Sequence, residues 1–279
     1  MSHDLLRALA IFAAGLAAGT INTVVGSGTL ITFPTLLAFG YPPVLANVSN
    51  NVGLVPGVAS GVYGYRSELG GQRRRLIRLG SASVCGGLVG AILLLTLPQS
   101  AFKDIVPALI GVAVVMVVIQ PRLAKWVAER QRARAAVTVP AGGSADDAAP
   151  AVAAPAAPAA REAIGGPVLW VLVFLAGIYG GYFGAAQGVL LIGLLGIALN
   201  DSLQRINAAK NVLAGLVNGL AAVVFIIATH VDWGVAGLIA AGSIIGGQVG
   251  ARVGRKLPPW GLRVVIVCVG VAALVKLLA

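Results

Sequence analysis

Charged side chains are scarce in this chain, and acidic side chains are the scarcest. Only 10% of the 279 residues are charged and 58% are hydrophobic, whereas a soluble domain carries about 25% charged residues. The mean hydropathy is +0.94. These values exclude an ordinary soluble domain and predict an all-α polytopic membrane protein, with the lipid bilayer as its surroundings.

None of the nine acidic residues lies in the middle of a long apolar run. All of them occupy segment ends, loops or the linker: Asp4, Glu68, Asp104, Glu129, Asp146, Asp147, Glu162, Asp201 and Asp232. An ionisable residue inside a membrane segment is a functional hypothesis by default. The sequence therefore predicts neither a carboxylate proton relay nor a carboxylate cation site within the membrane.

Residues for catalysis and metal binding are equally few. The only histidines, His3 and His230, lie at an end and in a loop, and Cys85 and Cys268 stand alone without a CxxC spacing. We predict no disulfide, no metal, no cofactor and no enzyme, and we expect both cysteines to pack within the helices. The phosphate loop GxxxxGK[ST] is absent as well, which disfavours a primary pump.

The net charge of +11 reports topology rather than nucleic-acid binding. Most of the 20 basic residues fall in three clusters beside apolar runs, at 66–78, 122–134 and 252–263. Lys and Arg collect in this way on the cytoplasmic flanks of membrane spans. We therefore expect no nucleic-acid partner.

Ten apolar stretches are present, five on each side of a linker. They cover 5–25, 30–39, 44–65, 76–97 and 102–119, and then 168–186, 189–199, 206–229, 233–251 and 262–279. A span needs about 20 residues, and the second stretch of each half is about half as long. That stretch is either a half-helix that dips in from one side or the continuation of a broken first helix.

The division into domains follows from these stretches. We predict a first membrane repeat at 1–121, a basic and then Ala/Pro-rich cytoplasmic linker at 122–166, and a second repeat at 167–279. The linker lacks the branched and aromatic side chains that a core needs. The fold class is thus two homologous halves with 8–10 transmembrane or half-membrane helices.

The two halves share a sequence pattern at a constant separation of 160 positions. Asn47 matches Asn207, Asn50 matches Lys210 and Asn51 matches Asn211, and Gly86-Gly-Leu-Val-Gly-Ala91 matches Gly246-Gly-Gln-Val-Gly-Ala251. The basic loops are exchanged between the halves, which favours an inverted repeat by the positive-inside rule. A parallel four-plus-four arrangement with re-entrant short segments stays open.

Polar residues interrupt the apolar runs at matching places in both halves, and they form the predicted substrate site. Backbone amides at the glycine turns would attract an anion, Lys210 would supply positive charge, and the amide side chains would donate hydrogen bonds. Interhelical hydrogen bonding of the asparagines and snorkelling of Lys210 remain alternatives. The predicted substrate-binding residues are Asn22, Ser27, Gly28, Asn47, Asn50, Asn51, Gln187, Gly188, Asn207, Lys210 and Asn211.

Several motifs resemble the sulfite exporter TauE/SafE family of membrane permeases. They are Gly15-Leu-Ala-Ala-Gly19, Gly26-Ser-Gly28, Leu30-Ile-Thr-Phe-Pro34, Pro42-Pro43, Ala46-Asn-Val-Ser-Asn-Asn51 and Gly177-Ile-Tyr-Gly-Gly-Tyr-Phe-Gly184. The chain departs from the family pattern at Thr29, where a glycine is common, and at Leu194, which matches Pro34. The second half-helix is therefore expected to be less sharply broken.

The resemblance implies a secondary transporter in the bacterial inner membrane. Its expected substrate is a small sulfur-containing anion such as sulfite, thiosulfate or an organosulfonate. A transporter or channel for another small organic or inorganic anion is the alternative. A homo-oligomer, the coupling ion and the direction of transport stay open at this point.

Overall fold

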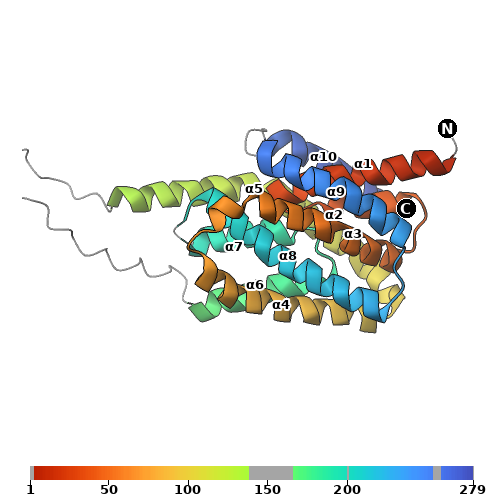
Figure 1. Ribbon diagram of the computed structural model, residues 1–279, viewed down its shortest axis with the longest axis horizontal. Helices are drawn as coiled ribbons and strands as arrows, with labels where there is room; N and C mark the ends of the chain where they lie inside the picture. Colours follow the sequence, from red (N-terminus) through yellow and green to blue (C-terminus); the bar gives the residue numbers. More distant parts are fainter. Residues whose placement is uncertain (1–2, 138–165, 200, 254–258, 279) are drawn as a thin grey trace, which may run out of the picture.

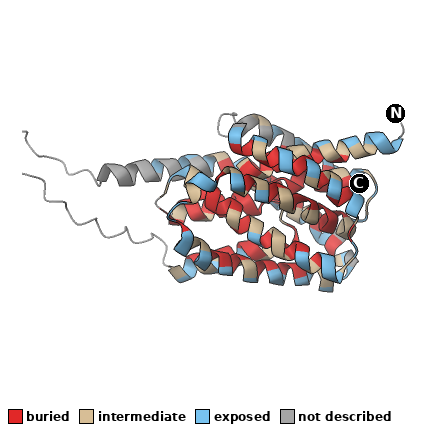
Figure 2. Ribbon diagram, in the orientation of Figure 1, coloured by how far each residue is buried: buried red, intermediate tan, exposed pale blue. Residues whose placement is uncertain are grey.

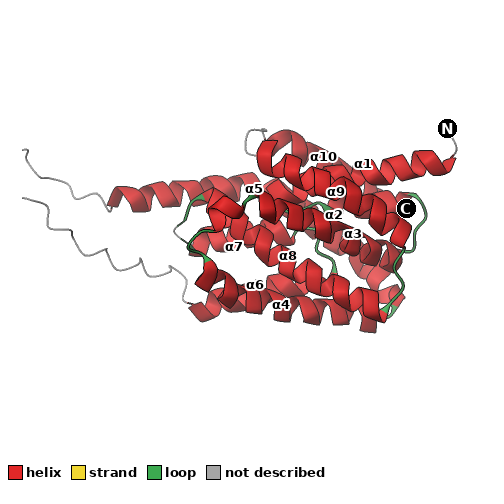
Figure 3. Cartoon of the chain, in the orientation of Figure 1, coloured by secondary structure: helices red, strands yellow, loops and turns green. Residues whose placement is uncertain are grey.

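The computed structural model describes residues 3–137, 166–199, 201–253 and 259–278, and these residues form helices joined by short loops (Figures 1 and 3). In the first half, the helices are α1 (His3–Val24), α2 (Thr29–Ala38), α3 (Pro43–Gly64), the short 3-10 helix η1 (Arg66–Leu69), α4 (Arg73–Thr96) and α5 (Gln99–Val137). In the second half, they are α6 (Gly166–Tyr182), α7 (Gln187–Ala198), α8 (Leu203–Ala228), α9 (Trp233–Val253) and α10 (Pro259–Leu278). The described part holds no strand, so the all-α class is confirmed.

Five of the described helices are long and apolar enough to cross a membrane, by length and composition. They cover His3–Val24, Arg73–Thr96, Ser100–Arg122, Leu203–Ala228 and Trp233–Arg252. The polytopic class is thereby confirmed. The predicted short stretches are short helices of 10 residues in α2 and 12 residues in α7.

Each short helix turns back along the long helix that precedes it. Gly26, in the turn after α1, has a φ of 90°, a left-handed value that glycine adopts without steric cost. Gly28 then lies against Ala18 of α1, and the Arg7 guanidinium stacks 4.5 Å from the Tyr41 ring beyond the end of α2. The first of the two expected arrangements, a half-helix that enters and leaves on one side, describes α2.

The second half repeats this hairpin at its own positive-φ glycine. Gly184 has a φ of 77° and lies between α6 and α7. Asp201, in the loop after α7, forms an ion pair with Arg75 of α4, with 2.8 Å between the guanidinium nitrogen and the carboxylate oxygen. Gly166, at the start of α6, lies beside Arg78, which is also on α4. The end of α7 therefore returns to the level at which α6 begins.

The helices of each half pack mainly against helices of the other half. The first helix of each half packs along the fourth helix of the other half, α1 on α9 and α6 on α4, and α3 packs on α8 between these pairs (Figure 1). Glycines allow the close approach: a Cβ at Gly15 would lie 2.8 Å from the Ile239 carbonyl oxygen. Small residues serve the same purpose at helix contacts in membranes generally.

Residues that face neighbouring helices are buried, and exposed residues lie on the outside of the bundle (Figure 2). Many of the exposed residues are large and apolar. Ile227, for example, is 80% exposed although it is aliphatic. Such a surface suits lipid contact and would be a liability in water. Cys85 and Cys268 are also exposed, so the expectation that they pack within the helices is wrong; each lies on an outward face of α4 or α10.

The first repeat and the linker are joined by a continuous helix. Helix α5 passes residue 121 and continues to Val137, across the whole of the basic cluster at 122–134. The Ala/Pro-rich remainder at 138–165 lies outside the described residues. The division at residues 121 and 166 stays a prediction.

Candidate functional site

The glycine turns of the two halves touch each other inside the bundle. The Gly188 amide donates a hydrogen bond to the Gly26 carbonyl oxygen at 3.2 Å, and a Cβ on Gly26 would lie 2.5 Å from the Gly188 Cα. Any side chain at either position would force the two backbones apart. We call residues 26–28 and 185–188 the paired turns.

Both half-helices begin at the paired turns with free backbone donors. Neither α2 nor α7 has a side-chain cap at its start. Within the described residues, no acceptor is bonded to the amide N–H of Ser27, Gly28, Thr29 or Gln187. Uncapped N–H groups at the positive end of a helix dipole are a ready-made anion site.

Two buried side chains at the paired turns also lack partners. Ser27 is 0% exposed and Gln187 is 2% exposed, and the Ser27 Oγ and the Gln187 Nε2 have no hydrogen-bond partner. A buried polar group without a partner costs about 1–3 kcal/mol. The arrangement is thus incomplete in a way that a polar ligand or water would complete.

Asparagines from the third helix of each half bind the end of the first helix of the other half. The Asn47 Nδ2 donates to the Tyr182 carbonyl oxygen at the end of α6, at 3.1 Å. The Asn207 and Asn211 Nδ2 atoms both donate to the Thr23 carbonyl oxygen at the end of α1, at 3.2 and 3.3 Å. These bonds satisfy carbonyls that a helix C-terminus leaves free, so interhelical bonding, the alternative considered for the asparagines, is present.

Asn50 and Asn51 behave differently from their matched positions. The Asn50 Nδ2 donates to the Thr29 Oγ1 at 3.4 Å, and its Oδ1 accepts from the Thr32 hydroxyl. Asn50 therefore holds the first turn of α2 in its own half. Asn51 is half-buried with an unpaired Oδ1.

Lys210 lies inside the bundle and does not snorkel. Its side chain is 1% exposed, and its Nζ donates to the carbonyl oxygens of Asn22 and Thr23, at 2.9 and 3.2 Å. The contribution of Asn22 to this contact is its backbone carbonyl. We call Asn207, Lys210 and Asn211, together with the carbonyls of Asn22 and Thr23, the α1 end cluster.

The structure brings the predicted residues into one buried polar band. Asn22 and Thr23 of the α1 end cluster come shortly before the turn at residues 26–28. Asn50 binds Thr29, the first residue after that turn. Two important acceptors, the carbonyls of Thr23 and Tyr182, are not among the predicted site residues. Because they are backbone groups, only the positions of the helix ends could have revealed them.

An ionic cluster lies at the loop between α7 and α8, away from the polar band. Asp201 accepts hydrogen bonds from Arg75 at 2.8 Å and from the Arg205 Nε at 2.7 Å. Burial raises the pKa of the Asp201 carboxyl, but hydrogen bonds from Arg75, the Ser202 amide and Arg205 outweigh burial and hold it below its usual value. The cluster fastens the start of α8 to α4.

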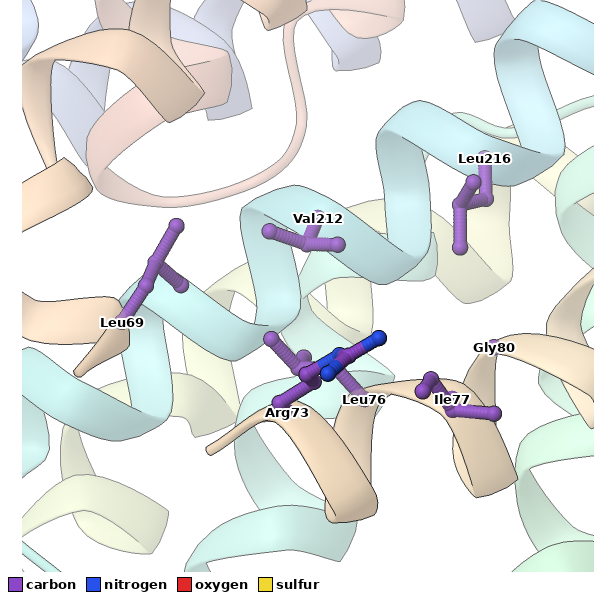
Figure 4. A pocket seen from close by; sticks show the side chains of 7 residues that line it. All are labelled: Leu69, Arg73, Leu76, Ile77, Gly80, Val212 and Leu216. Carbon is purple, nitrogen blue, oxygen red and sulfur yellow. The ribbon is translucent and has the colours of Figure 1, made fainter. Parts of the chain in front are cut away.

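A groove of about 410 Å³ runs between α4 and α8 (Figure 4). Apolar side chains and one guanidinium line it: Leu69, Arg73, Leu76, Ile77, Gly80, Val212 and Leu216. None of the predicted site residues is among them. The groove lies on the outer surface of the bundle, where α4 and α8 meet.

Comparison with known proteins identifies the chain at the level of its family. A model of the family described as "Sulfite exporter TauE/SafE" matches residues 11–277. The chain belongs to this family. No solved structure matches it.

Relatives of this TauE/SafE protein carry matching descriptions. It is 24% identical over 270 residues to "Probable membrane transporter protein ORF9" of Sinorhizobium sp, covering 96% of this chain and 91% of the relative. It is 26% identical to "Probable membrane transporter protein" of Haemophilus influenzae, with coverages of 89% and 85%. It is 24% identical to "Probable membrane transporter protein YfcA" of Escherichia coli K12, with coverages of 100% and 91%.

The family and the helices together establish a coarse function. The chain is a multi-pass membrane transporter. The family and these relatives are described as exporters or transporters and not as enzymes, which agrees with the expectation from its few histidines and cysteines.

Proposed function

We propose that this protein is a secondary transporter that moves a small sulfur-containing anion across the bacterial inner membrane. Sulfite, thiosulfate and organosulfonates are the expected class. The observation that carries the proposal is the contact between two uncapped helix starts, at which Ser27 and Gln187 are buried without partners. The family description supports the choice of sulfur.

The chemistry of the paired turns suits an oxyanion. Free amide N–H groups, a hydroxyl and a carboxamide can all donate to oxygens, and the two helix dipoles place their positive ends together. Lys210 adds a formal positive charge in the adjoining α1 end cluster. In this proposal Ser27 and Gln187 contact the anion, while Asn47, Asn207 and Asn211 hold the helix ends that shape the site.

We infer that the halves are inverted with respect to each other, which is one of the repeat arrangements that support alternating access in transporters. The Ser49 Oγ near the start of α3 accepts from the Asp232 amide beyond the end of α8. At the other end, Gln72 beyond the end of α3 binds the Arg205 carbonyl at the start of α8. Helices α3 and α8, which match in sequence, thus run in opposite directions.

This orientation predicts which loops face the cytoplasm. Single cysteines at Arg66 and His230, which lie in the matching loops after α3 and α8, should react with an impermeant maleimide from opposite sides of the membrane once both native cysteines are replaced. The basic cluster at 66–78 predicts that Arg66 faces the cytoplasm. Labelling of both cysteines from one side would contradict the inversion.

Ligand binding tests the function directly. Purified protein would be titrated with sulfite, thiosulfate, sulfoacetate, taurine, sulfate and a small carboxylate, by calorimetry and thermal shift. We expect one sulfur anion to bind and Ser27→Ala and Gln187→Leu each to weaken it about tenfold or more, the effect of losing roughly 1.5 kcal/mol.

Matched controls separate the site from general packing. Ser83 on α4 is also 0% exposed with an unpaired hydroxyl, and Gln120 on α5 is 5% exposed with an unpaired Oε1. Ser83→Ala and Gln120→Leu should leave binding unchanged. Equal losses in all four variants would contradict the assignment of the paired turns.

Two measurements distinguish the other candidate functions. If a carboxylate binds best in the titration, the proposed sulfur substrate is wrong and the proposal of an anion carrier remains. Counterflow in proteoliposomes, in which unlabelled anion inside accelerates entry of labelled anion, identifies a carrier. A channel for the same anion would give uptake without counterflow.

A further inference from the structure

The α1 end cluster has the composition of a cation site. Three donors meet the last carbonyls of α1: the Lys210 ammonium, the Asn207 amide and the Asn211 amide. No carboxylate of the described residues pairs with Lys210. The charge of the ammonium is therefore balanced by backbone carbonyls alone.

Backbone carbonyls at such a helix end also suit a free cation. A helix C-terminus carries the negative end of the dipole, and in transporters the C-terminal ends of interrupted helices coordinate the coupling cation. Helix α1 ends at Val24 inside the bundle and is followed by the Gly26 turn. The Lys210 Nζ thus lies where a coupling cation would find its ligands.

The second half shows the same helix end without a charge. Asn50 occupies the position that matches Lys210, and it binds Thr29 and Thr32 instead of the end of α6. The Tyr182 carbonyl at that end receives the Asn47 amide. The positive charge is therefore specific to one of two otherwise similar helix ends.

We propose that Lys210 is a tethered cation, which fills a monovalent-cation site at the C-terminal end of α1 and removes the need for sodium in the transport cycle. The ammonium nitrogen takes the place of the metal ion, and the carbonyl oxygens of Asn22 and Thr23 are its ligands. The side chain keeps this cation at a fixed stoichiometry of one per molecule. Removal of the side-chain amine should leave a vacant site for a small cation.

Thermal stability in chloride salts tests this proposal without reference to the anion substrate. Wild type and Lys210→Ala would be melted in sodium, potassium, ammonium, methylammonium and choline chloride at equal ionic strength. Wild type should melt at one temperature in all five salts. Lys210→Ala should melt about 3 °C higher in at least one small cation than in choline, the shift expected at ten times the dissociation constant.

Two further variants make the outcome decisive. Lys125→Ala removes an exposed lysine of α5 and should show no cation preference. Lys210→Gln keeps a neutral donor and covers the case in which Lys210→Ala does not fold. The proposal is overturned if wild type is itself stabilised by sodium over choline, or if folded Lys210 variants respond to no small cation.

Transport supplies a second readout, which rests on the carrier proposed above. Wild-type uptake should be equal in sodium and choline media, and Lys210→Ala should recover at least several-fold when the stabilising cation is added. A cation-dependent melting shift with no anion transport by wild type would leave the cation site standing and reject the carrier. Anion transport by wild type that requires sodium would do the reverse.

Discussion

Replacing Gly26 by alanine should destabilise the protein far more than the same change at another positive-φ glycine. A left-handed φ costs a residue with a Cβ about 1–2 kcal/mol. At Gly26 the new Cβ would also lie 2.5 Å from the Gly188 Cα and 2.8 Å from its carbonyl carbon. Overpacking of that kind costs typically 1–3 kcal/mol, and the Gly188–Gly26 hydrogen bond opposes relaxation.

The two contributions together give about 2–5 kcal/mol, or a fall of roughly 10 °C in melting temperature. Gly40 isolates the first contribution, because its φ is 82° and a Cβ there would meet nothing within 4 Å. Gly40→Ala should therefore lower the melting temperature by only about 3 °C. Both variants would be melted in the same detergent, by differential scanning fluorimetry and by loss of the monodisperse chromatography peak. Equal shifts for the two variants would refute the claim that the paired turns are in rigid contact.

Three other perturbations test the packing and the charges. Gly86→Ala should destabilise the protein by about 3 kcal/mol, because the new Cβ would meet the α6 backbone. Gly111→Ala has nothing near its new Cβ and should stabilise the protein by up to about 1 kcal/mol; chemical denaturation would measure both changes. Asn47→Ala should cost about 1–3 kcal/mol by freeing a buried carbonyl at the end of α6, seen as a lower melting temperature. Because the pKa of Asp201 is lowered, the carboxylate's contribution to folding stability is fully present above about pH 4 and is lost as the pH falls toward the folded-state pKa. Asp201→Asn should lower the stability by about 1 kcal/mol at neutral pH, a small value because the ion pair with Arg75 is partly exposed. The variant should also lose this dependence of stability on acid pH.

Much of the helical architecture is readable in the apolar runs. The lengths of α2 and α7 follow from hydropathy, and the constant separation between Asn47 and Asn207 marks corresponding positions. The hairpin between α1 and α2 is harder to foresee, because a glycine interruption is compatible with both a reversal and a kink. The contacts around Gly28 distinguish the two only in three dimensions.

The candidate site shows a similar division. Burial of Lys210 is suggested by its place inside an apolar run, but its partners are backbone carbonyls of the other half, which no side-chain pattern reveals. The prediction that the two cysteines pack between helices is wrong for a related reason. In a bilayer both the interior and the lipid-facing surface are apolar, so hydropathy alone could not tell that Cys85 and Cys268 face outward.

The packing of helices from one half against the other affects how the chain folds during its synthesis. Helix α1 emerges first, yet its packing partner α9 begins only at Trp233. At about 5–20 residues per second, α1 waits on the order of 10–50 seconds with its glycine stripe unmatched. Neither half can complete its own interior. A ribosome that stalls in the linker leaves a fragment in which α1 contacts α2 and α3 but lacks its main partner, α9. The quality-control machinery of the membrane should therefore recognise truncated chains readily, and the two halves made as separate polypeptides should be stable only when they are produced together.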